Sequence, residues 1–409
     1  MSAEGEGVNR TSLLCIAGAL ALASPLGAST ALAQPDCTSL PNAVIGAGGS
    51  ASKPLLALLA ARLAALPDPI TLVYASPGAC FGITPYVDGT GITGTAAYWN
   101  AAGVEQSCRL PTTGVEPDFG MMGTAATLCS GVEELPPGIG DFAGPVTGWS
   151  LIVPTESSQT SISSEALYFI YGFGPTGGVS PWTVPGEIYG RNATSAAQIA
   201  IGLASGVPAD RFVCGNAASG LPCLDVRTNQ AMITELDTSP NPEAAIGFVS
   251  SEVADLNRSV VRTLAYQHVD QTCGYWPDSS ATAFDKRNLR DGHYYLWSAY
   301  HFYARVNAAG AITDPDAARL IGYFTGDTPL PPSVPLLDLI IDNGTVPQCA
   351  MTVWRDSDIG PLYSYQPEEP CGCYYDFRAT GSSDCATCTT STDCPSSSPV
   401  CRFGYCEVI

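Results

Sequence analysis

The residues of this chain with the clearest chemical potential are an arginine and the hydroxyl residues that follow it, in the stretch "RNATSAAQIAIGLASG" at residues 191–206. Thr194 or Ser195 is well placed to cap a helix that ends at Gly206. A helix N-terminus presents unpaired backbone N–H groups and the positive end of the helix dipole, and Arg191 can add a bidentate clamp on an anion. The same residues also suit an ordinary capped surface helix, so the stretch alone leaves both alternatives open.

A second stretch that could present a helix N-terminus to an anion lies nearer the start of the chain. The glycine-rich turn "GAGGSAS" at residues 46–52 leads into the apolar run "PLLALLAARLAAL", and Pro54 suits the first turn of a helix. Alone, such a turn is typical of any tight connection between a strand and a helix. Two helix starts of this kind in one chain predict a cleft on which both converge.

The elements that must position these residues alternate along the chain. Strands are predicted on either side of the first helix, in the runs "NAVIGAG" and "ITLVYAS". The helix that follows Arg191 is preceded by a strand in "GWSLIVP", a helix in "SSEALYFIYG" and a strand in "EIYG". Further strand-bearing segments are "AAIGFVSSEVAD" and "YYLWSAYHFYARV". The alternation predicts an α/β fold with a parallel sheet, and the length exceeds one ordinary core, which predicts two lobes.

Enzyme chemistry finds little support in the residues. His268, His293 and His301 are the only histidines, and no G-x-S-x-G or H-E-x-x-H motif occurs. Cys385-x-x-Cys388 invites a zinc interpretation, but no second pair follows at finger spacing, so disulfides are favoured. We therefore expect neither catalysis, nor a metal, nor a cofactor.

The first 33 residues predict a secretory signal peptide, because an apolar run ends with Ala31 and Ala33 in an A-x-A arrangement. Its removal changes the formal charge from -21 to -20, since Glu4, Glu6 and Arg10 are lost. Such an acidic chain argues against nucleic acid as a partner. No later segment approaches the roughly 20 apolar residues that a membrane span needs.

Cysteines point to an oxidising compartment. Fifteen of the 16 cysteines follow the predicted signal, and seven of them lie between Cys371 and Cys406, in a segment poor in aliphatic residues. We expect residues 370–409 to form a small disulfide-rich module, because so few apolar residues cannot build a core. An odd number leaves one thiol without a partner in the chain, and Cys214 with Cys223 is the favoured local bridge.

The order of several landmarks resembles the periplasmic phosphate-binding subunits of ABC transporters. These landmarks run from Asn42 to Val306 and are "GAGGSASKPLL", "VYASPGACFG", "PDFGMMG", "GWSLIVP", "YFIYGFGPTGGVSPW", "EIYGRNATSAAQ", "AAIGFVSSEVAD" and "YYLWSAYHFY". The cysteine-rich end resembles that of a secreted subgroup. The resemblance implies a type II periplasmic-binding-protein fold. One lobe would comprise residues 34–150 and 292–369, the other residues 151–291, with crossings near "GWSLIVP" and "YYLWSAY".

The resemblance also implies a ligand site. Its first anion-contacting turn corresponds to Ser50 and Ala51, and its arginine and helix-start serine to Arg191 and Ser195, with Thr194 beside them. The chain departs from the family pattern at four positions where the family has polar contacts: Ala79, Gly123, Ala193 and Ala197. The residue at Gly123 would be an aspartate that accepts a hydrogen bond from a protonated phosphate.

Together these points predict a secreted, non-enzymatic solute-binding protein, in the periplasm or at the cell surface, that closes on a small oxyanion such as phosphate. An ABC permease would be its partner. Arg191, at the cleft edge, should matter for affinity and little for packing. The alternative is an extracellular interaction or structural protein that kept the fold and lost the transport ligand, because four expected polar contacts are missing.

Overall fold

The computed structural model describes residues 34–213 and 228–408. The expected signal peptide at residues 1–33 and the expected bridge between Cys214 and Cys223 lie outside the described residues. Within those two ranges, no helix has the length and apolar character needed to span a bilayer.

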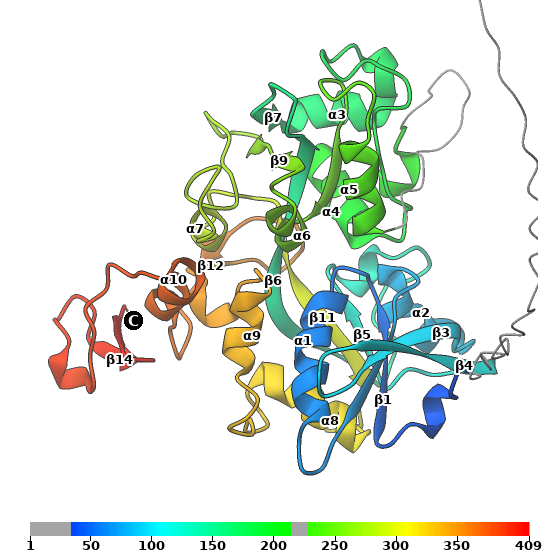
Figure 1. Ribbon diagram of the computed structural model, residues 1–409, viewed down its shortest axis with the longest axis vertical. Coiled ribbons are helices and arrows are strands. Elements are labelled where there is room, and N and C mark those ends of the chain that lie inside the picture. Colours follow the sequence, from blue (N-terminus) through cyan, green and yellow to red (C-terminus); the bar gives the residue numbers. More distant parts are fainter. Residues whose placement is uncertain (1–33, 214–227, 409) are drawn as a thin grey trace, which may run out of the picture. The chain divides into compact units, whose positions relative to one another are not determined.

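A nine-stranded mixed sheet runs through the described part (Figure 1). Its order is β4-β3-β2-β1-β5-β11-β6-β8, with β9 paired to β6. The strands are β1 (Ala43–Gly48), β2 (Thr71–Ala75), β3 (Ile92–Trp99), β4 (Glu105–Val115), β5 (Phe119–Met122), β6 (Ile139–Pro154), β8 (Gly247–Ser250), β9 (Val261–Thr263) and β11 (Trp297–Arg305). In this sheet, β1 pairs in parallel with β2 and β5, and the other pairs are antiparallel. The prediction of a parallel sheet is therefore wrong for most pairs, because the chain reverses at the short β3–β4 connection and again at β11.

The long strand β6 belongs to both halves of the sheet. Its first part pairs with β11, from Ile139 opposite Arg305 to Gly148 opposite Trp297. Its second part pairs with β8, beginning with Trp149 opposite Ser250. The segments in which the sequence predicts lobe crossings, "GWSLIVP" and "YYLWSAY", thus lie side by side at this junction, while the lobe limits themselves stay a prediction.

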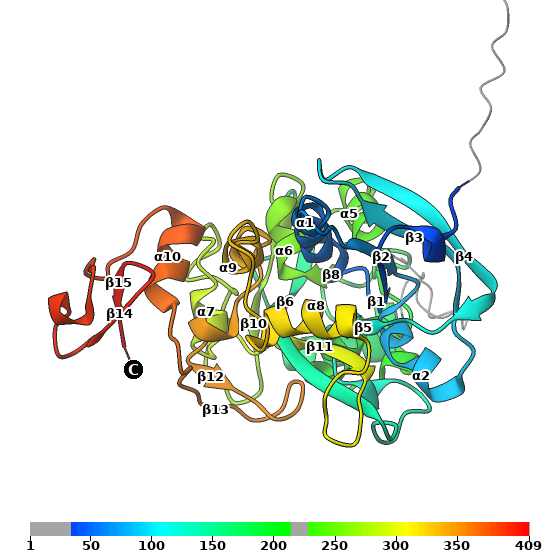
Figure 2. The same ribbon diagram turned by 90° about the horizontal axis from the view of Figure 1, so that it is seen from below.

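Helices flank the sheet on both sides of this junction (Figures 1 and 2). They are α1 (Lys53–Ala64), α2 (Thr84–Asp88), α3 (Ser164–Phe173), α4 (Ala196–Ser205), α5 (Asn229–Asp237), α6 (Ser251–Leu256), α7 (Arg287–Arg290), α8 (Pro315–Thr325), α9 (Leu336–Asp342) and α10 (Gly372–Thr380). Leucines of α1, α8 and α9 share one buried cluster with strands β1, β2, β5 and β11. Two helix starts lie where the sequence predicts them. Pro54 lies in the first turn of α1. The Ser163 hydroxyl caps α3 by accepting a hydrogen bond from the Ala166 N–H at 3.2 Å.

One predicted strand does not form. The segment "EIYG" forms isolated bridges in place of a strand, and the bridge whose two partners are described joins Ile188 in parallel to Ile246. The Ile246 N–H donates to the Glu187 carbonyl at 3.0 Å, and the Tyr189 N–H donates to the Ile246 carbonyl at 2.9 Å. Gly186, at a φ of 90°, breaks the extended backbone just before this pair, so no ladder can continue there.

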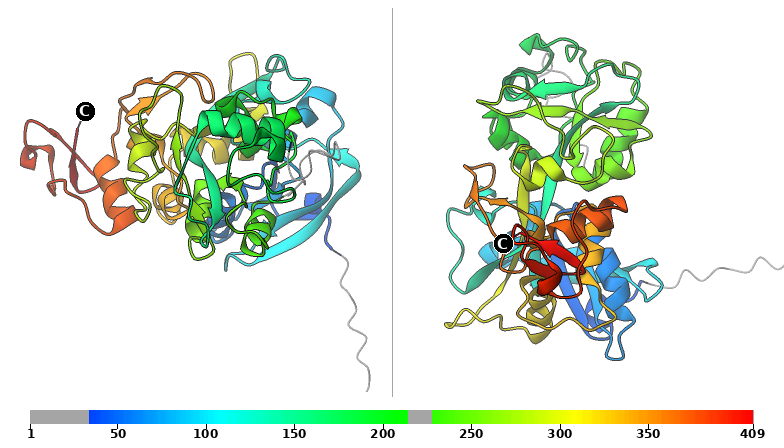
Figure 3. Two further views of the ribbon diagram at one scale, coloured as in Figure 1. Left: turned by 90° about the horizontal axis from the view of Figure 1, so that it is seen from above. Right: turned by 90° about the vertical axis from the view of Figure 1, so that its left-hand side faces the viewer.

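Disulfides hold the C-terminal region, which is coloured orange to red in Figure 3. Six bridges join described cysteines: Cys37–Cys108, Cys80–Cys129, Cys349–Cys371, Cys373–Cys385, Cys388–Cys401 and Cys394–Cys406. Three of them lie wholly within the cysteine-rich segment, whose Cys385 and Cys388 are both bridged, as the disulfide interpretation predicts. The short strand pairs outside the main sheet are β7 (Ser161–Ser163) with β10 (Ala265–Gln267), β12 (Val353–Trp354) with β13 (Tyr363–Ser364), and β14 (Val400–Arg402) with β15 (Tyr405–Glu407).

The start of this cysteine-rich segment is packed against the rest of the chain. Tyr375 of α10 is fully buried in the largest hydrophobic cluster, together with Cys371. The Tyr374 hydroxyl donates to Asp338 of α9, and Arg378 pairs with Asp342 at 2.6 Å. The helix α10 is thus fixed to α9, and the bridges beyond it stabilise a region with little apolar interior.

Candidate functional site

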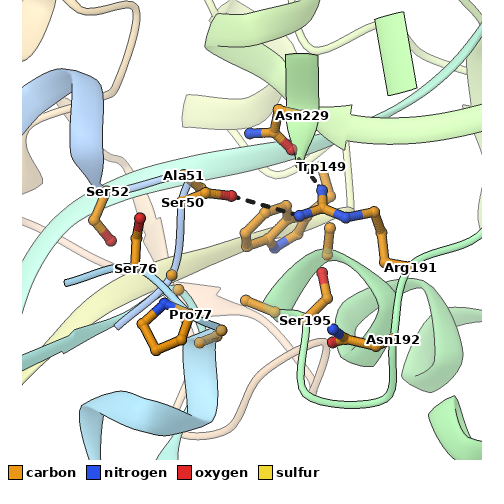
Figure 4. A pocket seen from close by; sticks show the side chains of 16 residues that line it. Ser50, Ala51, Ser52, Ser76, Pro77, Trp149, Arg191, Asn192, Ser195 and Asn229 are labelled. Atoms are coloured by element: carbon orange, nitrogen blue, oxygen red, sulfur yellow. Dashed lines mark hydrogen bonds between the residues drawn. The ribbon is translucent and has the colours of Figure 1, made fainter. Parts of the chain in front are cut away.

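The two helix starts singled out in the sequence meet at one small cavity (Figure 4). Its volume of about 30 Å³ is room for roughly two waters at ~10–15 Å³ each. Sites for organic ligands occupy roughly 300–1,000 Å³, so the cavity suits only a very small ligand. The lining residues are Gly49, Ser50, Ala51, Ser52, Ser76, Pro77, Gly78, Ala79, Gly123, Trp149, Arg191, Asn192, Ser195, Ala196, Ala197 and Asn229.

The turn between β1 and α1 forms one wall. Gly48 has a φ of 153°, and a Cβ atom there would lie 1.9 Å from the Met121 carbonyl oxygen, so only glycine fits. The Gly49 N–H donates to the same oxygen at 3.3 Å and fixes the turn against β5. The N–H groups of Ala51 and Ser52 donate to no described residue. The start of α1 therefore keeps backbone donors available at the cavity.

The loop before α4 is held by its own side chains. The Arg191 N–H donates to the Gln198 side-chain oxygen at 2.7 Å. The Asn192 side-chain oxygen accepts from the Thr194 N–H at 3.2 Å and from the Thr194 hydroxyl at 2.7 Å. These bonds turn the Thr194 hydroxyl toward Asn192, and Thr194 is not among the described residues that line the cavity.

The N-terminus of α4 forms the opposite wall. Ser195 is the N-cap residue, as the sequence predicts, but its hydroxyl makes no capping hydrogen bond. The N–H groups of Ala196 and Ala197 donate to no described residue, although both residues line the cavity. The first N–H groups of a helix have no partner within the helix, so these donors and the dipole of α4 favour negative charge at this point.

Arg191 joins the two walls. Its Nη1 donates to the Asn229 side-chain oxygen at 2.7 Å, and its Nη2 reaches the Ser50 hydroxyl at 3.5 Å, as the dashed lines in Figure 4 show. The residue is only 6% exposed. The expectation of an arginine at the cleft edge with little packing role is therefore wrong, because the side chain crosses a buried space to reach α5 and the β1–α1 turn.

An indole ring closes a further side of the cavity. Trp149 of β6 is 1% exposed, and its Nε1 donates to the Ser298 hydroxyl of β11 at 2.9 Å. The ring packs on Gly123, where a Cβ atom would lie 2.9 Å from two of its carbons and 3.4 Å from the Ala196 Cβ. No side chain fits at Gly123 unless Trp149 moves, so this side of the cavity is apolar.

A buried polar layer lies behind Asn229. The Asn229 side-chain amide donates to the Ser250 hydroxyl at 3.4 Å, and Glu252 follows two residues later at the start of α6. Glu252 is 1% exposed and accepts from the Thr147 hydroxyl at 3.1 Å. Burial raises the pKa of Glu252 to about 7, with nearby hydroxyls offsetting part of the effect. This carboxyl therefore changes charge near neutral pH.

The structure brings together most of the predicted site residues. Ser50, Ala51, Arg191 and Ser195 line the cavity, and Thr194 does not. Sequence reasoning missed five prominent members of the lining, which are Ser52, Ser76, Trp149, Asn192 and Asn229. Asn192 and Ser52 adjoin predicted residues and could have been included, whereas nothing in "NQAMITELD" marks Asn229 as a neighbour of Arg191.

Of the four positions that depart from the family pattern, three line the cavity and one does not. Ala79, Gly123 and Ala197 line the cavity, and Ala193 is exposed. Each of the three lining residues presents hydrogen or a methyl group where the resembled family has a polar contact. The cavity therefore relies on Arg191, on hydroxyl and amide side chains, and on backbone N–H groups.

Comparison with known proteins supports the architecture. No protein-family model and no curated protein matches the chain. Among solved structures, the chain is similar to a putative phosphate ABC transporter substrate-binding protein from Clostridium perfringens, solved with bound phosphate. The two sequences are 14% identical, the match covers 75% of this chain and 99% of that chain, and the TM-score is 0.50. An ABC-type phosphate transport receptor from Vibrio cholerae is 15% identical (74% and 99% covered, TM-score 0.47), and a phosphate-binding protein from Stenotrophomonas maltophilia is 14% identical (75% and 90% covered, TM-score 0.42).

Identities this low carry information about the fold and none about the ligand. The match at a TM-score of 0.50 covers 75% of this chain and 99% of the other, so the likeness extends over the whole of that structure. The chain has the mixed α/β type II periplasmic-binding-protein fold, followed by a C-terminal region with several disulfides.

Proposed function

We propose that the chain is a secreted solute-binding protein, without catalytic activity, that binds a small oxyanion such as phosphate in the cavity between α1 and α4. The observation that carries this proposal is the meeting of two open helix N-termini with the guanidinium of Arg191 at one small cavity. Each of these features attracts an anion, and anions commonly bind at helix N-termini.

The binding mechanism follows from which parts of the chain supply donors. The β1–α1 turn offers Ser50 and the N–H groups of Ala51 and Ser52, and the opposite wall offers Arg191 and Ser195. An oxyanion that contacts both walls holds them together, which is the usual closure mechanism of two-lobed binding proteins. Thr194 would act indirectly, by fixing Asn192, because its hydroxyl is already bonded there.

Isothermal titration of the purified chain with phosphate and related oxyanions tests the proposal. We expect saturable heat and a rise in melting temperature with ligand concentration, because a ligand that binds only the folded state stabilises it. Arg191→Ala should lose this response. The matched control is Arg62→Ala, which removes the same charge from an exposed position of α1. Equal binding by both variants would contradict the site.

The setting of the proposed protein follows from its disulfides. Six bridges among the described cysteines are typical of an oxidising compartment outside the cytoplasm. A transport role implies an ABC permease as the partner. Genes for a permease and an ATPase beside the gene of this chain would support that role.

One observation favours a second candidate, an extracellular interaction or structural protein that kept the fold and lost the transport ligand. Ala79, Gly123 and Ala197 give the cavity an apolar lining at three places, and each hydrogen bond that a charged ligand forgoes costs about 1.5–3 kcal/mol. The C-terminal region also exposes aromatic side chains, with Phe377 42% and Phe403 53% exposed. Absence of heat with every oxyanion would favour this candidate.

A further inference from the structure

A second pocket lies beside β11. It is lined by alternate residues of this strand, from Trp297 to His301, and by residues 354–358, where the chain leaves β12 toward β13 (Figure 2). The volume of this β11 pocket is about 220 Å³. A protein cavity of ~150 Å³ holds a benzene molecule, so the β11 pocket has room for a small organic molecule. Its described lining shares no residue with the cavity between α1 and α4.

One part of the lining carries a buried positive charge. Arg355 is 6% exposed, and its guanidinium carbon lies 3.9 Å from the centre of the Trp297 ring. Its Nη1 donates to the Trp297 carbonyl at 3.3 Å, and its Nη2 donates to the Tyr295 carbonyl at 3.2 Å. These bonds use two of the five N–H groups of a guanidinium, and the described contacts of Arg355 include no carboxylate. Burial lowers the pKa of Arg355 to about 10, so this side chain is charged at neutral pH and can receive an anionic group.

Another part of the lining carries a carboxyl group. One oxygen of Asp358 accepts from the Ala125 N–H at 2.7 Å, and the other makes no hydrogen bond to a described residue. Burial raises the pKa of Asp358, and the nearby His301 and Arg355 side chains offset part of this effect. Neither forms an ion pair with Asp358 among the described contacts, since His301 pairs with Asp141 at 2.9 Å. The carboxyl can therefore receive a cationic group.

The backbone holds Asp358 under strain. The next residue, Ile359, has a φ of 55°, which β-branched side chains rarely adopt. Such strain persists only where the surrounding structure imposes it, and it is frequent at binding sites. Between the charged groups the lining is largely apolar, with Ala299 and with Trp354, whose ring lies 6.0 Å from that of Trp297. The β11 pocket thus combines apolar surface with two opposite charges that are not paired with each other.

We propose that the β11 pocket binds a small zwitterion, of which a free α-amino acid with an apolar side chain is the simplest kind. The ligand carboxylate pairs with Arg355 and the ligand ammonium group pairs with Asp358, so that each compensates a charge of the lining. The ligand side chain contacts Trp354 and Ala299. A simple anion or a simple amine leaves one of the two charges uncompensated. This proposal does not depend on oxyanion binding between α1 and α4.

The first test is isothermal titration of the full chain at neutral pH with L-leucine and L-phenylalanine. Each is compared with its N-acetyl derivative, which lacks the ammonium group, and with its carboxamide, which lacks the carboxylate. At least one of the two amino acids should bind, and both of its derivatives should have a Kd higher by roughly tenfold or more, as the loss of one charged contact implies. Binding of neither amino acid would overturn the proposal, and so would a derivative that binds as tightly as its parent.

The second test locates the ligand. Asp358→Asn removes the charge and keeps an oxygen that can accept from the Ala125 N–H, so the Kd for the amino acid should rise by roughly tenfold or more. The matched control is Asp237→Asn, which removes the same charge from an exposed position at the end of α5, and its Kd should equal that of the wild type. An unchanged Kd in Asp358→Asn, with the fold intact by circular dichroism, would overturn the site. If this variant does not fold, the derivatives still decide the proposal on the unaltered chain.

Discussion

Replacement of Arg191 by alanine is the most informative perturbation of the candidate site. The side chain is 6% exposed and links the Asn229 oxygen, at 2.7 Å from Nη1, to the Ser50 hydroxyl, at 3.5 Å from Nη2. It is also the one charged side chain among the described residues of the cavity lining. Its removal takes away the positive charge and leaves only neutral donors to face the anion.

The expected loss of affinity follows from the bonds that the guanidinium can make. A hydrogen bond between charged partners contributes about 1.5–3 kcal/mol, which corresponds to roughly 10- to 150-fold in Kd. Arg191→Lys should lose less, because the charge remains while the planar fork does not. We therefore expect the order wild type, then lysine, then alanine, with at least tenfold between the first and the last.

Stability should also fall, because Arg191 is buried. The alanine variant leaves the Asn229 oxygen without its charged donor, and a buried group without a partner costs about 1–3 kcal/mol of unfolding free energy. Titrations must therefore be run well below the melting temperature of the variant, with folding checked by circular dichroism. An alanine variant that stays folded and binds the anion as tightly as wild type would refute the assignment of this cavity as the site.

Three further outcomes follow from the described contacts. Glu252→Gln should raise the free energy of unfolding by about 1–3 kcal/mol above neutral pH and little at acidic pH. Burial raises the pKa of Glu252 from 4.5 to about 7. Between these two pH values the folded chain keeps the Glu252 proton and the unfolded chain does not, so the free energy of unfolding falls as the pH rises. If the free energy of unfolding, measured by urea titration, depends on pH equally in the wild type and in Glu252→Gln, this reasoning is wrong. Gly123→Ala should cost about 1–3 kcal/mol in thermal unfolding, because its Cβ would meet Trp149 at 2.9 Å, whereas Gly172→Ala, with its nearest contact at 3.4 Å, is the tolerant control. Non-reducing peptide mapping should recover the six described bridges, with Cys273 as the free thiol among the described cysteines, and free thiols within the C-terminal bridges would contradict the arrangement.

Much of the local structure could be predicted because its causes are local. The apolar run after Pro54 and the cap at Ser163 are properties of neighbouring residues, and both helices form where the sequence indicates. Gly206, at a φ of 75°, ends α4 as the sequence predicts. Turn glycines, caps and proline positions act over a few residues, so a single sequence contains their signal.

The parts that could not be predicted depend on contacts between distant segments. Strand direction in the sheet is set by which strands meet, and the antiparallel partners of β11 lie more than 100 residues earlier in the chain. Asn229 meets Arg191 across 38 positions, and Trp149 occupies the space next to Gly123. No periodicity or short motif encodes such pairs, because they follow from the packing of the whole chain.

The proposed anion site can be divided in the same way, into backbone donors and side chains. The N–H groups at the starts of α1 and α4 exist wherever these helices exist, so the fold itself supplies half of the site. Alanine or glycine at positions 79, 123 and 197 removes side-chain contacts without disturbing these backbone donors. Backbone N–H groups carry only partial positive charges. A full positive charge at the cavity therefore needs a side chain, and Arg191 is the one charged side chain among the described lining residues. If the cavity binds an anion as proposed, the guanidinium of Arg191 supplies its charge and the backbone N–H groups supply hydrogen bonds, so loss of Arg191 should weaken binding most.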